Sequence, residues 1–179
     1  MNPAPNLILI GPMGAGKTSI GRRLAAMFEL AFVDVDQWVE QHTGVAIGTI
    51  FELEGEAGFR RREHAALEEL TRGRGRLIAT GGGAVLDPRN RRLLAERGFV
   101  VWLRTPVERQ LERLSRDRQR PLLAAPDRRQ RLQELAAARD PLYAASCDLA
   151  FESDQRRVAM AVDRLGAMIA ERWQRAGAA

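Results

Sequence analysis

The octapeptide at residues 11–18, Gly-Pro-Met-Gly-Ala-Gly-Lys-Thr, constrains the fold of this chain more than any other feature of the sequence. It fits the pattern G-x-x-x-x-G-K-[ST] at every fixed position. An apolar run at residues 7–10 precedes it, and an amphipathic segment reaching about residue 28 follows it. A buried strand, a glycine-rich turn and a helix in this order are typical of the start of an α/β domain with a parallel sheet.

The same octapeptide predicts a nucleotide-binding site. Its glycines let the backbone curl so that successive N–H groups point at phosphate oxygens, and the following helix N-terminus favours negative charge. Lys17 is expected to reach the β- and γ-phosphates, and the Thr18 hydroxyl to bind Mg²⁺. Lys17 is the only lysine among 28 basic residues, which indicates a role that needs a compact ammonium group. The predicted nucleotide contacts in this loop are Gly14, Ala15, Gly16, Lys17, Thr18 and Ser19.

Apolar runs alternate with amphipathic stretches along the whole chain, which is typical of a parallel sheet covered by helices. Strands are predicted at residues 7–10, 31–35, 77–80, 99–103 and 149–151. Helices are predicted from the phosphate loop to about residue 28 and at residues 37–42, 47–53, 56–71, 88–97, 107–115, 128–138 and 156–175. The sequence has neither an internal repeat nor a linker between domains, so residues 1–179 are predicted to form one domain.

The charge balance raises nucleic acid as a partner, because the net charge is +5 and the pI is about 10.7. The basic residues, however, are spread along the chain among Asp and Glu, with little aromatic interleaving. This distribution favours a solvated surface with a few phosphate-handling arginines. We therefore expect no nucleic-acid partner.

The apolar runs are far shorter than the roughly 20 residues that a membrane span requires. The N-terminal segment lacks the basic region of a secretory signal. A lone cysteine, Cys147, excludes an internal disulfide and agrees with a reducing compartment. A cytoplasmic protein without a membrane partner is expected.

Two other classes of nucleotide-binding protein are disfavoured. A switch GTPase normally carries an Asn-Lys-x-Asp motif that reads the base, and here the single lysine already belongs to the phosphate loop. A motor or helicase domain is usually longer and has an apolar strand that ends in Asp-Glu, which this sequence lacks. A kinase acting on a small molecule remains.

Five further segments, in this order, resemble the shikimate kinase family, and the resemblance runs from residue 7 to the last helix. The second strand ends in two carboxylates, Asp34 and Asp36, which strand alternation places on one face at the carboxyl edge of the sheet. The other segments are Phe59-Arg60 with Glu63 one turn later, Gly81-Gly82-Gly83-Ala84-Val85, Arg120-Pro121-Leu122-Leu123, and Arg139-Asp140-Pro141-Leu142-Tyr143.

The resemblance implies a three-layer α/β P-loop kinase fold with a five-stranded parallel sheet of order 2-3-1-4-5 flanked by helices. It implies a substrate-binding helical region at about residues 37–71 and a lid at about residues 116–127. The implied reaction is transfer of the γ-phosphoryl group of ATP to the 3-hydroxyl of shikimate, giving shikimate 3-phosphate and ADP in aromatic amino-acid biosynthesis. Mg²⁺ is the implied cofactor, and a monomer is expected.

The resemblance also assigns roles to residues of this chain. Arg60 and Arg139 are suited to the shikimate carboxylate because guanidinium pairs with it in a planar, bidentate way. Glu63 lies three residues after Arg60 on the same helix and could orient it. Gly81, Gly82 and Gly83 let the backbone approach the substrate ring.

Asp36 is the candidate for binding the acceptor hydroxyl and taking its proton, and it could also cap the next helix. Asp34 is expected to bind Mg²⁺ through water. Arg120 in the lid is expected to close over the transferring phosphoryl group. Arg113 and Arg156 fall where the family flanks the adenine, and His42 and His64 are expected on helix surfaces.

Two alternative functions stay open on the sequence. Another small P-loop kinase, of the gluconate or nucleoside monophosphate type, would share the phosphate loop but lack the combined set of five segments. A nucleotide-dependent nucleic-acid-binding protein is indicated only by the high pI, and its binding would weaken steeply with salt.

Overall fold

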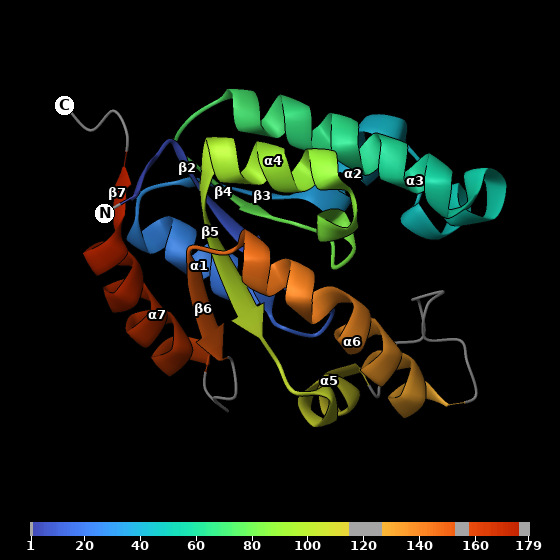
Figure 1. The fold of residues 1–179 in the computed structure, drawn as a ribbon. Coiled ribbons are helices and arrows are strands. Elements are labelled where there is room, and N and C mark those ends of the chain that lie inside the picture. The colour runs from blue at the N-terminus through green and yellow to red at the C-terminus, as the bar shows by residue number, and fades with distance from the viewer. Residues whose placement is uncertain (1, 115–126, 153–157, 176–179) are drawn as a thin grey trace.

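The computed structural model describes residues 2–114, 127–152 and 158–175. Its main sheet has five parallel strands in the order β3-β4-β2-β5-β6 (Figure 1). The strands are β2 (Asn6–Ile10), β3 (Ala31–Asp34), β4 (Arg76–Ala79), β5 (Gly98–Arg104) and β6 (Leu149–Glu152). Numbered along the chain, these five strands have the order 2-3-1-4-5. The predicted fold class and strand order are confirmed.

Alternate residues of β2, β4 and β5 enter two separate cores, one on each face of the sheet. Leu7 and Leu9 of β2 pack with helices α1 (Lys17–Met27) and α7 (Val158–Arg172). Ile8 and Ile10 face the other core. The helices on that side are α2 (Val35–Thr43), α3 (Ile47–Arg72), α4 (Pro88–Arg97) and α6 (Arg128–Ser146). This arrangement gives the three predicted layers, because both faces of a parallel sheet are covered (Figure 1).

Helix α3 carries the break that the sequence predicts between its two helical segments. Gly55 has φ 68° and ψ −177°, a conformation outside the helical region that only glycine adopts readily. The chain therefore turns sharply within residues 47–72 instead of running as one straight rod. The turn leaves the second segment of α3 free to pass over α4.

Helix α6 is longer than predicted, because it runs from Arg128 to Ser146 instead of ending near residue 138. Pro141 lies inside it, where proline lacks the N–H for the helical bond to the carbonyl four residues earlier. The predicted end of this helix near residue 138 was wrong. Tyr143 is buried in the core that also contains α2, α3 and α4, and this burial stabilises the helix beyond the proline.

A second sheet was not predicted. It pairs β1 (Asn2–Ala4) with β7 (Trp173–Arg175) in parallel, so the predicted final helix ends at Arg172 rather than at residue 175. The Trp173 indole N–H also donates to the carbonyl of Ala4 at 3.1 Å. The two strands lie at opposite ends of the chain, and local sequence patterns do not reveal such a pairing.

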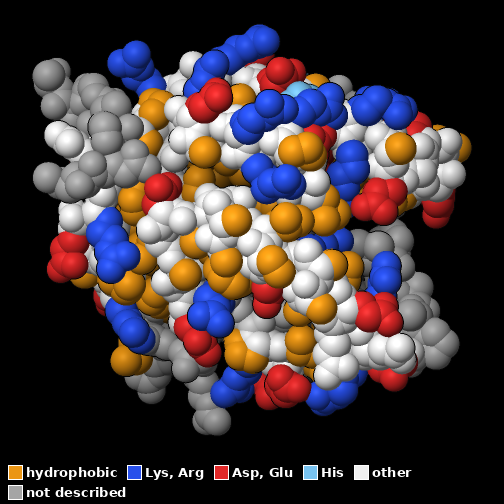
Figure 2. Space-filling model, in the orientation of Figure 1, with side chains coloured by type: hydrophobic (Ala, Val, Ile, Leu, Met, Phe, Trp, Pro, Cys, Tyr) orange, Lys and Arg blue, Asp and Glu red, His pale blue; other side chains and the backbone are white. Residues whose placement is uncertain are grey.

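Two short elements follow strands at the carboxyl edge of the sheet. They are η1 (Ala84–Leu86), a 3₁₀ turn after β4, and α5 (Val107–Leu114) after β5. On the face shown in Figure 2, Lys and Arg side chains are interspersed with Asp and Glu. Within the described residues, no helix is both long enough and apolar enough to cross a bilayer.

Candidate active site

The phosphate loop curls tightly between β2 and α1. Gly11 and Gly16 have φ of 140° and 85°, and a Cβ on Gly11 would lie 2.5 Å from the carbonyl oxygen of Leu103 in the neighbouring strand. Gly16 caps α1 without a side-chain hydrogen bond, and the first turn of that helix has no acidic residue. The helix N-terminus is therefore open to an anion.

Lys17 lies across this loop. Its Nζ donates to the carbonyl oxygens of Gly11 at 2.7 Å and Pro12 at 2.8 Å, which draws the ammonium group over the curl. A cavity of about 340 Å³ is lined here by Gly14, Gly16, Lys17, Thr18 and Ser19. Ala15 is fully buried, and its N–H donates to the carbonyl of Pro12 at 3.3 Å.

Thr18 and Asp34 meet at the floor of this cavity. The Thr18 hydroxyl donates to Asp34 Oδ2 at 2.8 Å, which joins the start of α1 to the end of β3. Asp34 Oδ1 accepts from the backbone N–H of Asp36 at 3.1 Å and of Gln37 at 3.4 Å. Asp34, and not Asp36, thus caps α2, which corrects the expected cap.

The Thr18 hydroxyl and the Asp34 carboxylate fit a Mg²⁺ site. Both are hard oxygen donors of the kind that this ion binds together with phosphates and water. Within the described ranges, no group of three or more His, Cys, Asp and Glu side chains could hold a metal alone. A magnesium ion carried in with a nucleotide, needing only one or two protein oxygens, suits this pair.

A second cavity, of about 580 Å³, adjoins the first. Helix α2 and the first half of α3 form one wall of it, and the glycine triplet and α6 form another. Both cavities are lined by Met13, Asp36, Gln37, Gly81 and Gly82. Asp36 therefore lies where the phosphate cavity and this acceptor cavity meet.

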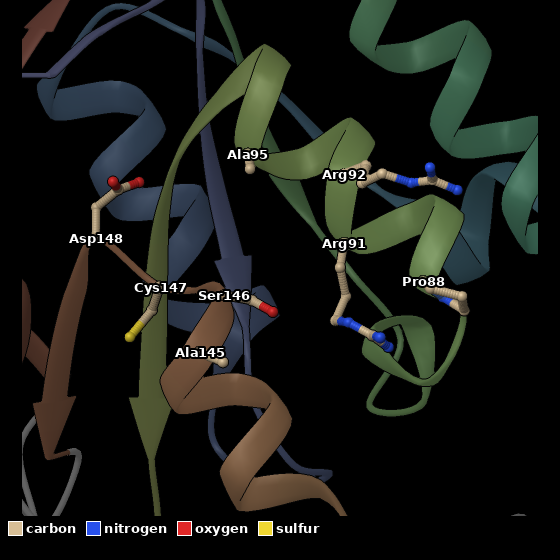
Figure 3. A pocket seen from close by; sticks show the side chains of 8 residues that line it. All are labelled: Pro88, Arg91, Arg92, Ala95, Ala145, Ser146, Cys147 and Asp148. Atoms are coloured by element: carbon tan, nitrogen blue, oxygen red, sulfur yellow. The ribbon is translucent and has the colours of Figure 1, made fainter.

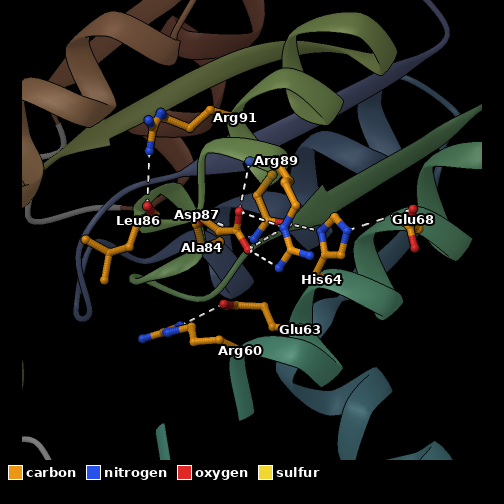
Figure 4. Close-up of polar contacts among 10 residues, drawn as sticks. Arg60, Glu63, His64, Glu68, Ala84, Leu86, Asp87, Arg89 and Arg91 are labelled. Carbon is orange, nitrogen blue, oxygen red and sulfur yellow. Dashed lines mark hydrogen bonds and ion pairs between the residues drawn. The ribbon is translucent and has the colours of Figure 1, made fainter. Parts of the chain in front are cut away.

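Arg60 projects from α3 into the acceptor cavity and is held by two carboxylates. Its Nη1 donates to Glu63 Oε2 at 2.7 Å (Figure 4). Its Nη2 donates to Glu56 Oε1 at 2.9 Å. Glu63 is fully buried, and burial raises its pKa; Arg60 lowers it and Asp36 raises it further. Glu63 therefore fixes the guanidinium, as the i, i+3 spacing indicates.

The glycine triplet lies against these charged groups. A Cβ on Gly81 would lie 2.6 Å from Glu63 Oε1 and 3.1 Å from Asp36 Oδ1, and a Cβ on Gly83 would overlap the Arg60 guanidinium. No acceptor within the described parts of the chain takes the N–H groups of Gly81, Gly82 and Gly83. Glycine is needed here because the backbone and the charged side chains occupy adjoining space.

Arg139 enters the acceptor cavity from α6 and, like Arg60, lies beside the glycine triplet. It is 6% exposed, and its Nη1 lies 3.5 Å from the position that a Cβ on Gly82 would take. None of the ion pairs among the described residues involves it. A buried guanidinium is costly without a counter-charge, so the site is suited to an anionic ligand.

Two residues named in the sequence analysis received no site role there. Tyr143 is buried and donates its hydroxyl to the carbonyl of Gly82, and burial raises its pKa to about 12. His64 was expected on a helix surface, yet it is half-buried and contacts the fully buried Asn90. The position of Tyr143 after Pro141 was a usable signal, whereas nothing local marks Asn90.

Of the arginines predicted near the nucleotide, Arg113 is described. Its Nη1 donates to the carbonyl of Gly14 at 2.8 Å, so α5 delivers it to the phosphate loop. Arg120 and Arg156 lie outside the described residues, as does the predicted lid apart from Asp127.

A cavity of about 420 Å³ lies apart from these residues, between α4 and the end of α6 (Figure 3). Arg91 on its wall is already committed, because its Nη1 donates to the carbonyls of Val85 at 2.7 Å and Leu86 at 3.2 Å. No predicted site residue lines it. The predicted residues that the structure describes gather instead around the two adjoining cavities.

Comparisons with known proteins agree with this geometry. A family model described as shikimate kinase matches residues 13–170. The shikimate kinase of Stenotrophomonas maltophilia (strain K279a) is 60% identical over 175 residues, covering 98% of this chain and 97% of that protein. The structure of shikimate kinase from Acinetobacter baumannii in complex with shikimate is similar with a TM-score of 0.89 and 45% identity, covering 94% of each chain.

A gluconokinase from Sinorhizobium meliloti 1021 is also similar, with a TM-score of 0.61 and 20% identity, covering 95% of this chain and 94% of that one. That likeness concerns the fold alone. The family model, by contrast, matches most of the chain. This chain belongs to the shikimate kinase family.

Proposed function

We propose that this protein transfers the γ-phosphoryl group of ATP to the 3-hydroxyl of shikimate, giving shikimate 3-phosphate and ADP. The observation that carries the proposal is the meeting of the phosphate cavity and the acceptor cavity at Asp36, Gly81 and Gly82. An acceptor bound on one side of this junction faces a nucleotide bound on the other, and such positioning supplies much of the catalysis of phosphoryl transfer.

The acceptor cavity suits a small ring with a carboxylate and several hydroxyl groups. Arg139 and Arg60, which both lie beside the glycine triplet, would bind the carboxylate through charge-assisted hydrogen bonds. The N–H groups of Gly81, Gly82 and Gly83 would donate to its oxygens. Glu63 binds no substrate atom in this scheme and keeps Arg60 in place.

Asp36 would accept a hydrogen bond from the reacting hydroxyl. As that oxygen bonds to the γ-phosphorus, the bond from the γ-phosphorus to the bridging β–γ oxygen breaks, and the hydroxyl proton passes to the Asp36 carboxylate. ADP leaves with the bridging oxygen. The transition state is loose, so Asp36 serves mainly to orient the hydroxyl.

The phosphate cavity would hold the transferring group by backbone and charge. The open N-terminus of α1 and the Lys17 ammonium would stabilise the β- and γ-phosphates. Thr18 directly and Asp34 through water would hold Mg²⁺, which neutralises charge on the β- and γ-phosphate oxygens when bound. Arg113 and Arg156 are proposed to flank the adenine, and Arg120 to reach the γ-phosphoryl group from a lid at residues 116–127.

Three broader proposals accompany the activity. We propose that the protein acts as a monomer without a nucleic-acid or membrane partner, the former because its basic residues are spread among Asp and Glu along the chain. The lone cysteine is compatible with the reducing cytoplasm. We propose one P-loop kinase domain at residues 1–179, with residues 37–71 binding the acceptor.

An acceptor panel tests the proposed reaction. ADP release is followed with ATP and Mg²⁺ in the presence of shikimate, gluconate, a nucleoside monophosphate or no acceptor. Strong release with shikimate alone is expected, because a flexible acid or a nucleotide does not match the two guanidinium groups and the glycine backbone together. Equal or faster release with gluconate or the nucleoside monophosphate would contradict the proposal.

A further inference from the structure

A chain of polar contacts joins helix α3 to the glycine loop through helix α4. His64 Nδ1 lies 2.6 Å from Asn90 Oδ1, and Asn90 Nδ2 donates to the carbonyl oxygen of Ala84 at 2.9 Å. Asn90 and Ala84 are both fully buried. We propose that His64 and Asn90 are positioning residues that hold Arg60 and the glycine triplet in register for the acceptor. This inference rests on the proposed function.

The donor and the acceptor of each hydrogen bond in this series follow from the Ala84 carbonyl at one end. The Ala84 carbonyl can only accept, so the Asn90 amide nitrogen faces it and the amide oxygen faces His64. His64 Nδ1 must then carry a hydrogen. It does so in the protonated ring as well as in this neutral tautomer, while Nε2 faces Glu68 Oε1 at 3.8 Å (Figure 4). The contact is therefore kept whichever charge the ring has.

The Ala84 bond is one of a series that ties down every carbonyl of the glycine loop. The Gly81 carbonyl accepts from Ala84 N at 3.2 Å, and that of Gly83 accepts from Leu86 N at 3.0 Å. The Gly82 carbonyl accepts from Tyr143, and those of Val85 and Leu86 accept from Arg91. With the carbonyls held on the protein side, the N–H groups of the three glycines are left for the acceptor cavity.

At its other end, this series of contacts starts from His64, which directly follows Glu63 on α3. Glu63 positions Arg60, and the Arg60 guanidinium lies against Gly83. One hydrogen-bonded path therefore connects the helix that supplies the cation to the loop that supplies the N–H groups. Loss of the path would let these two walls of the acceptor cavity shift, whereas the hydrogen bonds of His64 and Asn90 in this path lead to Ala84 and not to the phosphate loop.

Steady-state kinetics on four variants tests the inference. His64→Leu keeps side-chain volume but removes the donor, and Asn90→Leu removes the link from the other side. His64→Asn restores a donor at the position of Nδ1. His42→Ala changes the other histidine, which is exposed and stacked on Trp38. Thermal melting of each variant shows whether it is folded at the assay temperature.

We expect the KM for shikimate to rise about three- to tenfold in His64→Leu and Asn90→Leu, the effect of one lost hydrogen bond. The KM for ATP should stay unchanged, His64→Asn should recover most of the loss, and His42→Ala should match the wild type. If only one of the two leucine variants folds, that variant decides. Folded variants with an unchanged KM for shikimate, or with both KM values raised alike, would overturn the inference.

If both leucine variants fail to fold while His64→Asn folds, the pair has only a structural role and the inference is also overturned. The proposed function fails by a different result. A wild-type protein without shikimate-dependent ADP release would contradict that function, whereas an active wild type with unaffected variants would contradict only the positioning role.

Discussion

At the residue scale, the acceptor cavity depends on charged side chains that the fold takes out of water. Glu63 is fully buried, Arg139 is 6% exposed, and Arg60 connects Glu63 to the cavity. Buried charges are costly unless they are paired, so such residues are retained where a ligand or a partner needs them. The spacing of Arg60 and Glu63 was visible in the sequence, because three residues on a helix form a local contact. The burial of Arg139 was not, because it depends on how α6 packs.

The raised pKa of Glu63 predicts how stability changes with pH. The folded protein holds this proton to a higher pH than the unfolded chain, whose glutamate titrates near 4.5. Wild-type stability contributed by this carboxyl is therefore greatest below pH 4.5 and is lost as pH rises through the folded pKa. Glu63→Gln removes this dependence. Its free energy of unfolding should therefore rise relative to that of the wild type between pH 4 and pH 7.

Urea unfolding at a series of pH values measures this difference. Glu69→Gln, at an exposed position on the same helix, is the control for removing a carboxylate from α3. The difference in free energy of unfolding between the wild type and Glu63→Gln should change with pH more than the difference for the control does. A difference that is constant with pH, or that changes no more than the control, would show that burial does not raise the pKa of Glu63.

At the element scale, the glycine loop at residues 81–86 joins the two halves of the site. Its glycines are required because charged side chains lie against its backbone. Local patterns predicted the loop, the phosphate curl and the break in α3 at Gly55, because glycines mark such places in any context. Contacts between distant segments could not be predicted. The β1–β7 pair joins opposite ends of the chain, and Asn90 is 26 residues from His64. The continuation of α6 through Pro141 likewise depends on the burial of Tyr143.

Adding one methyl group to this loop should disable acceptor binding alone. In Gly81→Ala the new Cβ would lie 2.6 Å from Glu63 Oε1 and 3.1 Å from Asp36 Oδ1, so backbone or carboxylates must move. Gly48→Ala is the matched control, because a Cβ there meets nothing within 4 Å although Gly48 lines the same cavity. Calorimetric titration should show weakened shikimate binding and normal ATP binding in Gly81→Ala only. Equal shikimate affinity in the two variants would refute the close packing.

At the scale of the whole molecule, the sheet separates two cores and presents the site at its carboxyl edge. The core with α1 and α7 supports the phosphate loop, and the core with α2, α3, α4 and α6 supports the acceptor cavity. Each half can change without the other, since the cavities share only the residues around Asp36. This edge was predictable from the sequence because parallel strands place their carboxyl ends together.

Arg120, outside the described residues, is predicted to act across both halves. Closure of a lid at residues 116–127 would bring its guanidinium to the γ-phosphoryl group and exclude water. Arg120→Ala should lower kcat on the order of 10³-fold, as for other arginines that stabilise a transferring phosphoryl group. The KM for shikimate should change far less. Hydrogen exchange of this segment should slow when both ligands bind, and normal turnover in Arg120→Ala would refute the role.

The central claim is that acceptor and nucleotide occupy adjoining but separately built cavities, with the acceptor carboxylate held by Arg139 and Arg60. Equilibrium titration of Arg139→Ala and Arg60→Ala with shikimate, and separately with ATP, tests it most directly. We predict that each variant loses about 2–4 kcal/mol of shikimate binding free energy, because a charged partner is left unpaired, and binds ATP normally. Unchanged shikimate affinity in both variants, or an equal loss for ATP, would contradict the account.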